Sequence, residues 1–235
     1  MAWHEESFLA LDIESTGTDP WTDRIVTASL VEVRNGKTEH VQSWLLNPGV
    51  PIPAGAEAVH GISTLQASKD GVAPELALEE ITSALAGWLE QLKPVVAFNA
   101  AFDLTMLETE NQRHGVTTLT ERVAEIRPVI DPLIVDKHVD TYRRGKRTLT
   151  ALTLHYGVAL ENAHSATADA EAAAGLVPKI LERFPGLGDY SLDALHDAQK
   201  LWQSEQQRSL AAYFKRQGNL EAAQSMRPGW PTSSR

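Results

Sequence analysis

The segment Phe8-Leu9-Ala10-Leu11-Asp12-Ile13-Glu14-Ser15-Thr16-Gly17 places two carboxylates inside an apolar run. Apolar side chains at positions 8, 9, 11 and 13, followed by a Thr-Gly stop, predict a buried β-strand. Because successive side chains of a strand point to opposite faces, Asp12 and Glu14 project from the same face. Two adjacent carboxylates repel each other and resist desolvation, so the strand either holds a divalent metal or is a solvated edge strand with a polar face.

The composition is that of an ordinary soluble domain. The 235 residues are 43% hydrophobic and 22% charged, which fits one α/β domain with an appendage, or two small domains. No cysteine is present, so any metal must bind oxygen or imidazole ligands. Residues 1–6 lack the basic and apolar regions of a signal peptide, and no apolar run approaches the ~18 residues of a membrane span. We therefore expect a cytoplasmic protein with no membrane partner.

The formal net charge of −10 disfavours nucleic acid as a partner, because phosphate binding depends largely on Lys and Arg. One basic loop, between Asp136 and Arg147, is the local exception. Its cations are Lys137, Arg143, Arg144, Lys146 and Arg147. The loop is either a solvated turn around Gly145 or a phosphate-binding segment, depending on whether it lies beside the carboxylates.

The first half of the chain predicts three consecutive antiparallel strands followed by helices. The second strand is indicated by β-branched side chains over 24–33, and the third by alternating side-chain character over 38–46. Asn35-Gly36 between them is a strong signal for a hairpin turn. Ser63 is the expected N-cap of a short helix, and near-helical apolar spacing predicts another helix over 74–92.

The second half alternates short strands with helices. We expect strands at 95–98 and 126–130 and helices over 99–114, 148–156 and 165–184, the last one kinked or divided by Pro178. Strands first, then helices alternating with short strands, predict an α/β fold with a mixed sheet flanked by helices.

The C-terminal part has a different character. Residues 185–188 are typical of a hinge, and 191–217 form a predicted helix rich in glutamine and charge. Leu195, Trp202 and Tyr213 fall on nearly one face of it, which is either a docking face onto the chain's own domain or a partner surface. We expect a main domain over 1–186 and a helical extension over 187–235, with a loosely ordered end at 227–235.

Two further acids lie near the starts of predicted helices. Asp103 ends the segment Phe98-Asn99-Ala100-Ala101-Phe102-Asp103, and Asp169 lies five residues after His164. Either acid alone could serve only to complement a helix dipole. Together with the two acids of the first strand, they supply hard oxygen ligands for two Mg²⁺ or Mn²⁺ ions, with His164 as a nearby titratable base.

Three motifs therefore follow one another: Asp-x-Glu with Thr-Gly at 12–17, Asn-Ala-x-Phe-Asp at 99–103, and His-x4-Asp at 164–169. This ordered set resembles the DEDD superfamily of 3′→5′ exonucleases, in the DEDDh branch that has a catalytic histidine. That branch includes DnaQ-type proofreading subunits, ribonuclease T and oligoribonuclease. The resemblance covers about residues 7–182 and implies a ribonuclease H-like fold.

The resemblance also implies a metal-dependent mechanism. The acids Asp12, Glu14, Asp103 and Asp169 would hold two metal ions, one generating the nucleophile and the other stabilising the leaving 3′-oxygen. His164 would take the proton from the attacking water and is not expected to be a metal ligand. The products would be nucleoside 5′-monophosphates released from the 3′ end of a single strand.

Substrate contacts are implied as well. The backbone around Thr16 would contact the terminal nucleotide, and His60 and Ile62 would contact or wedge its base. Asn99 would support the second motif or the substrate. If the basic loop lies at the rim of the cleft, backbone phosphates would be bound by Arg143, Arg144 and Arg147.

Two positions depart from the family pattern. Phe98 stands where many members have His, and Thr27 stands where many proofreading subunits have an acid. Neither belongs to the metal set, so these departures bear on assignment to the proofreading subfamily rather than on catalysis.

Three functions stay open. The favoured one is a DNA exonuclease of replication or repair, whose protein partner would be a DNA polymerase or a repair complex. The second is an RNA exonuclease, whose site would have to test the 2′-hydroxyl. The third is a non-catalytic binding or assembly module that keeps the fold.

Overall fold

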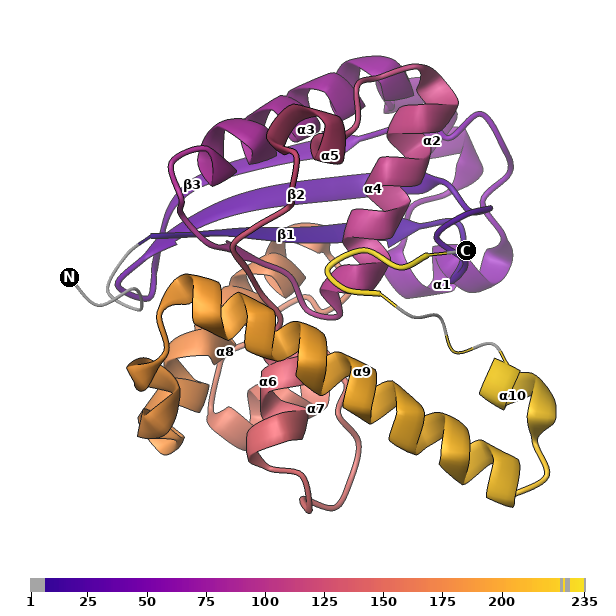
Figure 1. Ribbon diagram of the computed structural model, residues 1–235. Helices are drawn as coiled ribbons and strands as arrows, with labels where there is room; N and C mark the ends of the chain where they lie inside the picture. The colour runs from indigo at the N-terminus through magenta and orange to yellow at the C-terminus, as the bar shows by residue number, and fades with distance from the viewer. Residues whose placement is uncertain (1–6, 225, 227–228, 235) are drawn as a thin grey trace.

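A five-stranded mixed sheet organises the computed structural model, which describes residues 7–224, 226 and 229–234 (Figure 1). The N-terminal residues considered as a leader, 1–6, and positions 227, 228 and 235 of the tail lie outside the described residues. In sheet order β3-β2-β1-β4-β5, the strands are β3 (Lys37–Leu45), β2 (Ile25–Arg34), β1 (Phe8–Ser15), β4 (Val95–Val96) and β5 (Val129–Ile130).

The sheet is antiparallel on one side of β1 and parallel on the other. β2 pairs antiparallel with both β1 and β3, whereas β4 runs parallel to β1 and β5 runs parallel to β4. Both the three consecutive antiparallel strands and the mixed sheet were predicted from the sequence, and both are confirmed. β1 is consequently the central strand, so its side chains are flanked by neighbours on both edges.

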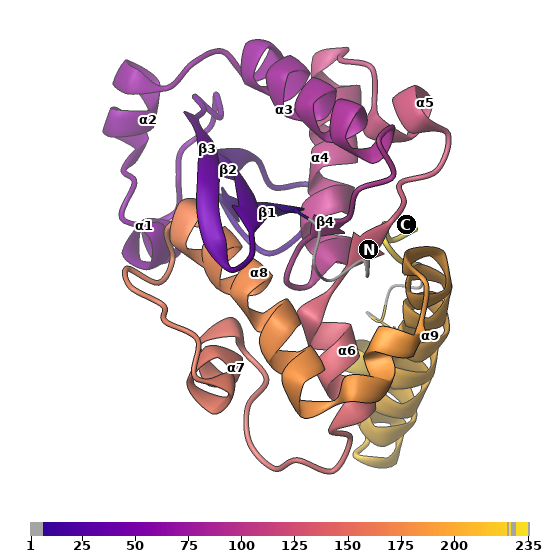
Figure 2. The same cartoon turned by 90° about the vertical axis from the view of Figure 1, so that its left-hand side faces the viewer.

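Helices cover both faces of the sheet. In chain order they are α1 (Ala54–His60), α2 (Thr64–Asp70), α3 (Pro74–Leu89), α4 (Ala100–His114), α5 (Leu119–Val123), α6 (Pro132–Val139), α7 (Leu149–Tyr156), α8 (Ala166–Arg183), α9 (Leu192–Arg216) and α10 (Leu220–Gln224). α8 packs on β1 and β2 from one side, and α3 and α4 lie on the opposite side (Figure 2). No helix in the described part of the chain is both long and apolar enough to cross a membrane.

α8 lies close to the sheet because its buried side is made largely of alanine. Ala166, Ala170, Ala173 and Ala174 are all buried, and such small side chains let a helix backbone approach β1 and β2. Pro178 lies within α8 but does not divide it, because the helix runs from 166 to 183; of the two expected effects of this proline, only a kink stays open.

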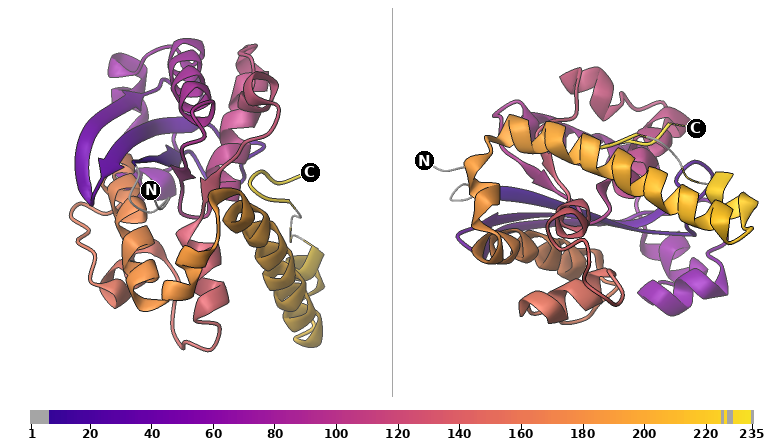
Figure 3. Two further views of the ribbon diagram at one scale, coloured as in Figure 1. Left: turned by 60° about the vertical axis from the view of Figure 1, so that its left-hand side comes forward. Right: turned by 60° about the horizontal axis from the view of Figure 1, so that its bottom comes forward.

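The first half of α9 shares the core of the rest of the chain. Leu195 and Trp202 are buried in the main hydrophobic cluster, whereas Tyr213 is 48% exposed. The second half of α9 extends away from the sheet (Figure 3). The face predicted from the sequence is therefore a docking face onto the chain's own core over its first half only.

The tail expectation was wrong for residues 229–234. Trp230 is buried and packs against His196 of α9 with ring centroids 4.8 Å apart. The amide of Ser233 donates a hydrogen bond of 2.8 Å to Thr105 Oγ1 of α4. The C-terminal segment thus lies between α4 and α9, where Figure 3 also shows it.

Candidate active site

The Thr-Gly stop after β1 builds a tight loop around Asp23. Thr16 Oγ1 donates to Asp23 Oδ1 and accepts from the amide of Arg24, and the amide of Asp19 donates to Asp23 Oδ2. A Cβ at Gly17 would lie 2.5 Å from that same carboxylate, so a larger residue would displace Asp23 from its hydrogen bonds. The loop therefore fixes the direction in which β1 ends, directly after Asp12 and Glu14.

The register of β1 turns these two acids toward α8. Asp12 pairs with Ser29 and Glu14 with Thr27 on β2, and directly opposite residues share a face. Ser29 Oγ lies 2.9 Å from Thr167 Oγ1 in the first turn of α8. This contact holds the start of α8, and with it Asp169, over the carboxylate face of β1.

Asp103 reaches the same place from α4. β4 pairs with β1 only at Leu9 and Ala10, so its pairing ends two residues before Asp12 and the chain then enters α4. The carboxylate of Asp103 is 4% exposed and accepts a hydrogen bond of 3.0 Å from the amide of Ile13. Since Ile13 lies between the two acids of β1, this bond joins the second motif to the first.

His164 and Asp169 are held together by the turn that starts α8. The amide of His164 donates to both carboxylate oxygens of Asp169, at 3.3 and 3.4 Å. His164 has a φ of 70°, a left-handed conformation that is uncommon for residues other than glycine and that clusters at functional sites. Ligand atoms of Glu14, His164 and Asp169 all lie within 4.8 Å of one another.

The electrostatics of the site reflect four crowded acids. Burial, together with the charges of Asp103 and Asp169, raises the pKa of Asp12 well above its usual range. Burial also raises the pKa of Asp103 well above its usual range, against the hydrogen bond from Ile13 that lowers it. Burial and the charge of Asp169 raise the pKa of Glu14 to about 7. A cation placed among these groups would lower their pKa values again, since a nearby opposite charge favours the ionised carboxylate.

The donor set fits a hard divalent metal. Its carboxylate oxygens come from three elements, β1, α4 and α8, and carboxylates are the ligands that Mg²⁺ and Mn²⁺ prefer. The imidazole of His164 is within reach of the same centre, so geometry alone leaves it either as a ligand or as a base. The alternative of a solvated edge strand does not hold, because β1 is the central strand.

The loop after α1 also meets this centre. The ring of His60 lies beside the backbone of Ser15, and burial lowers the pKa of His60. His60 Nδ1 accepts from the amide of Ile62, whose side chain packs on a small cluster containing Val26 and Ile52. His60 therefore adjoins the end of the first motif, whereas Ile62 is half-buried, and the contact of both residues with a terminal base stays a prediction.

Asn99 precedes α4 in a left-handed conformation, with a φ of 66°. Its amide and that of Ala100 donate to the two carboxylate oxygens of Asp131, at 3.1 and 2.9 Å. Asp131 is 1% exposed and burial raises its pKa to about 6. Sequence reasoning did not find Asp131, although its place directly after an apolar strand and before Pro132 is where an N-cap falls.

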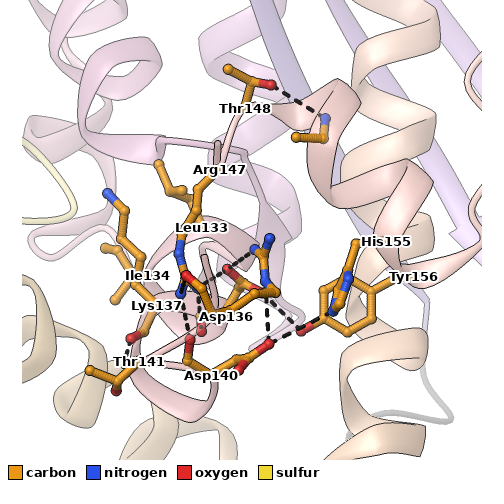
Figure 4. A network of polar contacts seen from close by, with 12 residues as sticks. Leu133, Ile134, Asp136, Lys137, Asp140, Thr141, Arg147, Thr148, His155 and Tyr156 are labelled. Atoms are coloured by element: carbon orange, nitrogen blue, oxygen red, sulfur yellow. Dashed lines mark hydrogen bonds and ion pairs between the residues drawn. The ribbon is translucent and has the colours of Figure 1, made fainter. Parts of the chain in front are cut away.

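The basic loop is only partly available for a substrate. Arg143 Nη2 donates to Asp136 Oδ2 at 2.9 Å, and Arg147 forms an ion pair with the same oxygen. The hydroxyl of Tyr156 donates to Asp136 Oδ1 at 2.8 Å (Figure 4). Asp136 itself is fully buried.

This network bears on one expectation from the sequence, that arginines of the loop bind backbone phosphates. Both guanidinium groups are turned inward to a buried carboxylate, which argues against Arg143 and Arg147 as phosphate ligands. Arg144, by contrast, is exposed. The loop was predicted from its charge, but its two Asp residues were counted as a minority rather than as partners.

The chain belongs to the exonuclease family, because the family model named for RNase T and described as "Exonuclease" matches residues 9–177. Among curated proteins, the PolC-type DNA polymerase III of Staphylococcus saprophyticus is 28% identical over 182 residues, which are 77% of this chain and 12% of that protein. The PolC-type polymerase of Staphylococcus aureus is also 28% identical, over 78% of this chain and 12% of that protein. The chain thus matches a minor part of much longer relatives.

Solved structures confirm the fold class. Escherichia coli exonuclease I in complex with a dT13 oligonucleotide superposes with a TM-score of 0.66 and 21% identity, over 79% of this chain and 43% of that one. Exonuclease X in complex with 5′ overhanging duplex DNA gives a TM-score of 0.58 and 19% identity, over 82% of this chain and 99% of that one. The expected mixed sheet of an exonuclease, followed by a long C-terminal helix, is therefore present.

Proposed function

We propose that the chain is a metal-dependent 3′→5′ exonuclease that removes nucleoside 5′-monophosphates from the 3′ end of single-stranded DNA. The observation that carries the proposal is the convergence of Asp12, Glu14, Asp103 and Asp169 beside His164, on a family fold. DNA is favoured over RNA because the relatives are named as DNA polymerases or were solved with DNA bound.

The four carboxylates are the residues that would hold two Mg²⁺ or Mn²⁺ ions. When bound, such ions activate water and stabilise the charge that develops on the leaving oxygen. The chain's own part is to orient the ligands: the amide of Ile13 holds Asp103, and the amide of His164 holds Asp169. This preorganisation avoids rearrangement during the reaction.

The imidazole of His164 is the proposed general base. It lies next to Glu14 and Asp169 and is exposed, so it can exchange protons with solvent. It would take a proton from the attacking water at the nitrogen that faces the scissile phosphate. The left-handed turn at His164 keeps the ring on the carboxylate side of α8.

The terminal nucleotide would lie over the end of β1. The backbone at Thr16, the ring of His60 and the side chain of Asn99 remain its proposed contacts, with Ile62 beneath the base. Among the loop cations, Arg144 is the proposed phosphate contact. The proposed protein partner is a DNA polymerase or a DNA repair complex.

The test is the degradation of 5′-labelled single-stranded DNA and RNA of matched sequence, with Mg²⁺, with Mn²⁺ and with chelator. A ladder that shortens from the 3′ end, requires metal and proceeds faster on DNA is expected. Asp12→Asn should abolish it, whereas Asp70→Asn, at the exposed end of α2, should not. A ladder on RNA only would contradict the DNA assignment, and no ladder on either polymer from folded protein would overturn the proposal.

A further inference from the structure

A cleft lies next to the candidate active site, at the start of α4. Its volume is about 440 Å³, and its walls are the β1–β2 loop, the first turn of α4, α6, the middle of α9 and the C-terminal segment. Phe102 and Asn99 line the cleft, and Phe102 directly precedes Asp103. The cleft therefore begins where the candidate active site ends.

The C-terminal extension supplies the outer wall. Gln203, Gln206 and Gln207 of α9 line the cleft. Gln203 donates to the carbonyl of Gly229 and Gln206 donates to the carbonyl of Ile134, so both amides hold the walls in place. Gln207 is half-buried and, within the described residues, its side chain makes no hydrogen bond.

The floor adds one cation. Lys137 of α6 lines the cleft and, in the part of the chain that the structure describes, forms no hydrogen bond or ion pair through its ammonium group. The acids that line the cleft are already occupied: Asp131 accepts from backbone amides, and Asp19 accepts from the amide of Trp21. Among the described lining residues, the side-chain amide of Gln207 and the ammonium group of Lys137 are thus left for a ligand, with the side-chain amide of Asn99 at the active-site end of the cleft.

Aromatic surface completes the cleft, from Trp21, Phe102 and Trp230. A nucleotide matches this lining, because its base is a flat ring with polar edges and is attached to a phosphate backbone. Aromatic side chains stack on bases, glutamine amides bind base edges, and lysine binds phosphate.

We propose that this α9 cleft binds an unpaired nucleotide of the substrate strand on the 5′ side of the scissile bond, with Gln207 at the base edge and Lys137 at a phosphate. The inference rests on the proposed exonuclease function and extends it, because the proposed positions of the terminal nucleotide and the scissile phosphate are the end of β1 and the carboxylates, and only Asn99 is shared with the cleft. The C-terminal extension thereby becomes part of the substrate path.

The test separates this subsite from the catalytic centre by using two substrates. One is a single-stranded DNA 12-mer, and the other is the p-nitrophenyl ester of thymidine 5′-monophosphate, in which a p-nitrophenolate leaving group replaces every nucleotide on the 5′ side of the terminal one. Gln207→Ala should raise KM for the 12-mer about fivefold, the equivalent of one hydrogen bond. Lys137→Gln should raise it about tenfold and lower the salt slope of 12-mer binding by ~0.7. Neither variant should change kcat or KM for the ester.

Arg208→Gln is the matched control, because it removes one positive charge from α9 at a residue that does not line the cleft. Equal KM values for the 12-mer in wild type, Gln207→Ala and Lys137→Gln would overturn the subsite, as would a parallel loss on both substrates. Wild-type protein that cleaves neither substrate would instead contradict the proposed function. In that case, equal 12-mer binding by fluorescence anisotropy in all three proteins would overturn the subsite as well.

Discussion

At the scale of single residues, Glu14 lies in an environment that disfavours the ionised form of its carboxylate. Its pKa is raised to about 7 from 4.5, so the folded protein binds a proton more tightly than the unfolded chain does. Without metal, stability should therefore fall as the pH rises from about 4.5 to about 7. Glu14→Gln should be more stable than wild type at pH 8 in chelator, by roughly 1–2 kcal/mol after allowance for partial exposure.

Urea unfolding at pH 5 and pH 8 checks this expectation. The difference between variant and wild type should be small at pH 5 and should appear at pH 8. Glu171→Gln, an exposed acid farther along α8, is the control and should show no such pH dependence. A Glu14→Gln variant that is less stable than wild type at pH 8 would mean that the carboxylate is satisfied without a cation.

Asp131 acts on the site through α4. Its carboxylate accepts from Asn99, Ala100 and Leu133, which ties the start of α4 to the start of α6. Asp131→Asn replaces one acceptor oxygen by a donor that faces a backbone amide, so we expect a loss of about 2–3 kcal/mol in stability. The start of α4 carries Asp103, so kcat should fall while KM for the mononucleotide ester stays nearly constant.

Unchanged kcat in a destabilised Asp131→Asn variant would assign this residue to stability alone.

The catalytic acids could be predicted from the sequence because each lies in a short motif with its partner nearby. Asp131 could not, because its role is to accept hydrogen bonds from backbone amides 31 and 32 positions away, and no local pattern records that.

At the scale of elements, side chains of α9 form hydrogen bonds with backbone groups at β5, the edge strand of the sheet. The amide of Val129 donates to His196 Nδ1 at 3.1 Å, and Gln199 accepts from the amide of Asp131 and donates to the carbonyl of Val129. Gln199→Leu would leave the amide of Asp131 and the carbonyl of Val129 buried without these partners. We expect a loss of about 3 kcal/mol in urea unfolding, whereas Gln207→Ala on the same helix should cost under about 0.5 kcal/mol.

The same contact makes stability depend on pH. Burial lowers the pKa of His196 to about 4, so the folded protein keeps this ring neutral. Between about 6.5 and about 4 the unfolded chain binds the proton and the folded protein does not, so stability is lost as the pH falls through that window. The loss should be on the order of 2 kcal/mol.

His196→Asn keeps an acceptor for Val129 but cannot titrate. Its unfolding free energy should therefore be flatter between pH 6.5 and pH 4 than that of wild type, measured as a difference at each pH. A variant with the same pH dependence as wild type would place the titrating group elsewhere.

The network around Asp136 distinguishes the arginines of the basic loop. Arg147→Ala leaves a fully buried carboxylate short of one partner, and we expect it to cost about 3 kcal/mol in stability. Arg144→Ala should leave stability unchanged and weaken single-strand binding. If Arg147→Ala is stable and instead weakens binding alone, the inward pairing is not the role of that residue.

The boundaries of the elements show what local patterns can and cannot give. The strands β1 to β3 and the helices α3, α4, α8 and α9 were predicted within a few residues, because each is long and periodic. α5 and α6 were missed, because each is a short helix defined by its caps: Thr118 and Glu121 form a capping box, and Asp131 caps α6. Three consecutive antiparallel strands and a mixed sheet were predicted from the order of the elements, but the strand order of the sheet and the packing of α9 on β5 depend on long-range contacts.

At the scale of the whole molecule, the negative charge is compatible with a nucleic-acid substrate only when the carboxylates are neutralised locally. Metal binding to the folded protein alone should raise its stability by about 2.7 kcal/mol at a concentration 100 times Kd. Thermal unfolding with increasing Mn²⁺ should show this rise, and Asp12→Asn should largely lose it. Equal stabilisation of wild type and variant would place the ion outside the four acids.

During synthesis, the two edge strands of the sheet become protected from pairing with another chain at different times. β3 carries its own charged side chains, among them Lys37 and Glu39, and such charges discourage pairing with another chain from the moment the hairpin forms. β5 has only two residues, and the side chains that bond to its backbone, His196 and Gln199, are synthesised far later. A nascent chain that has not yet emerged as far as α9 therefore presents an open strand edge, and interrupted translation before residue 191 would leave fragments prone to associate through it.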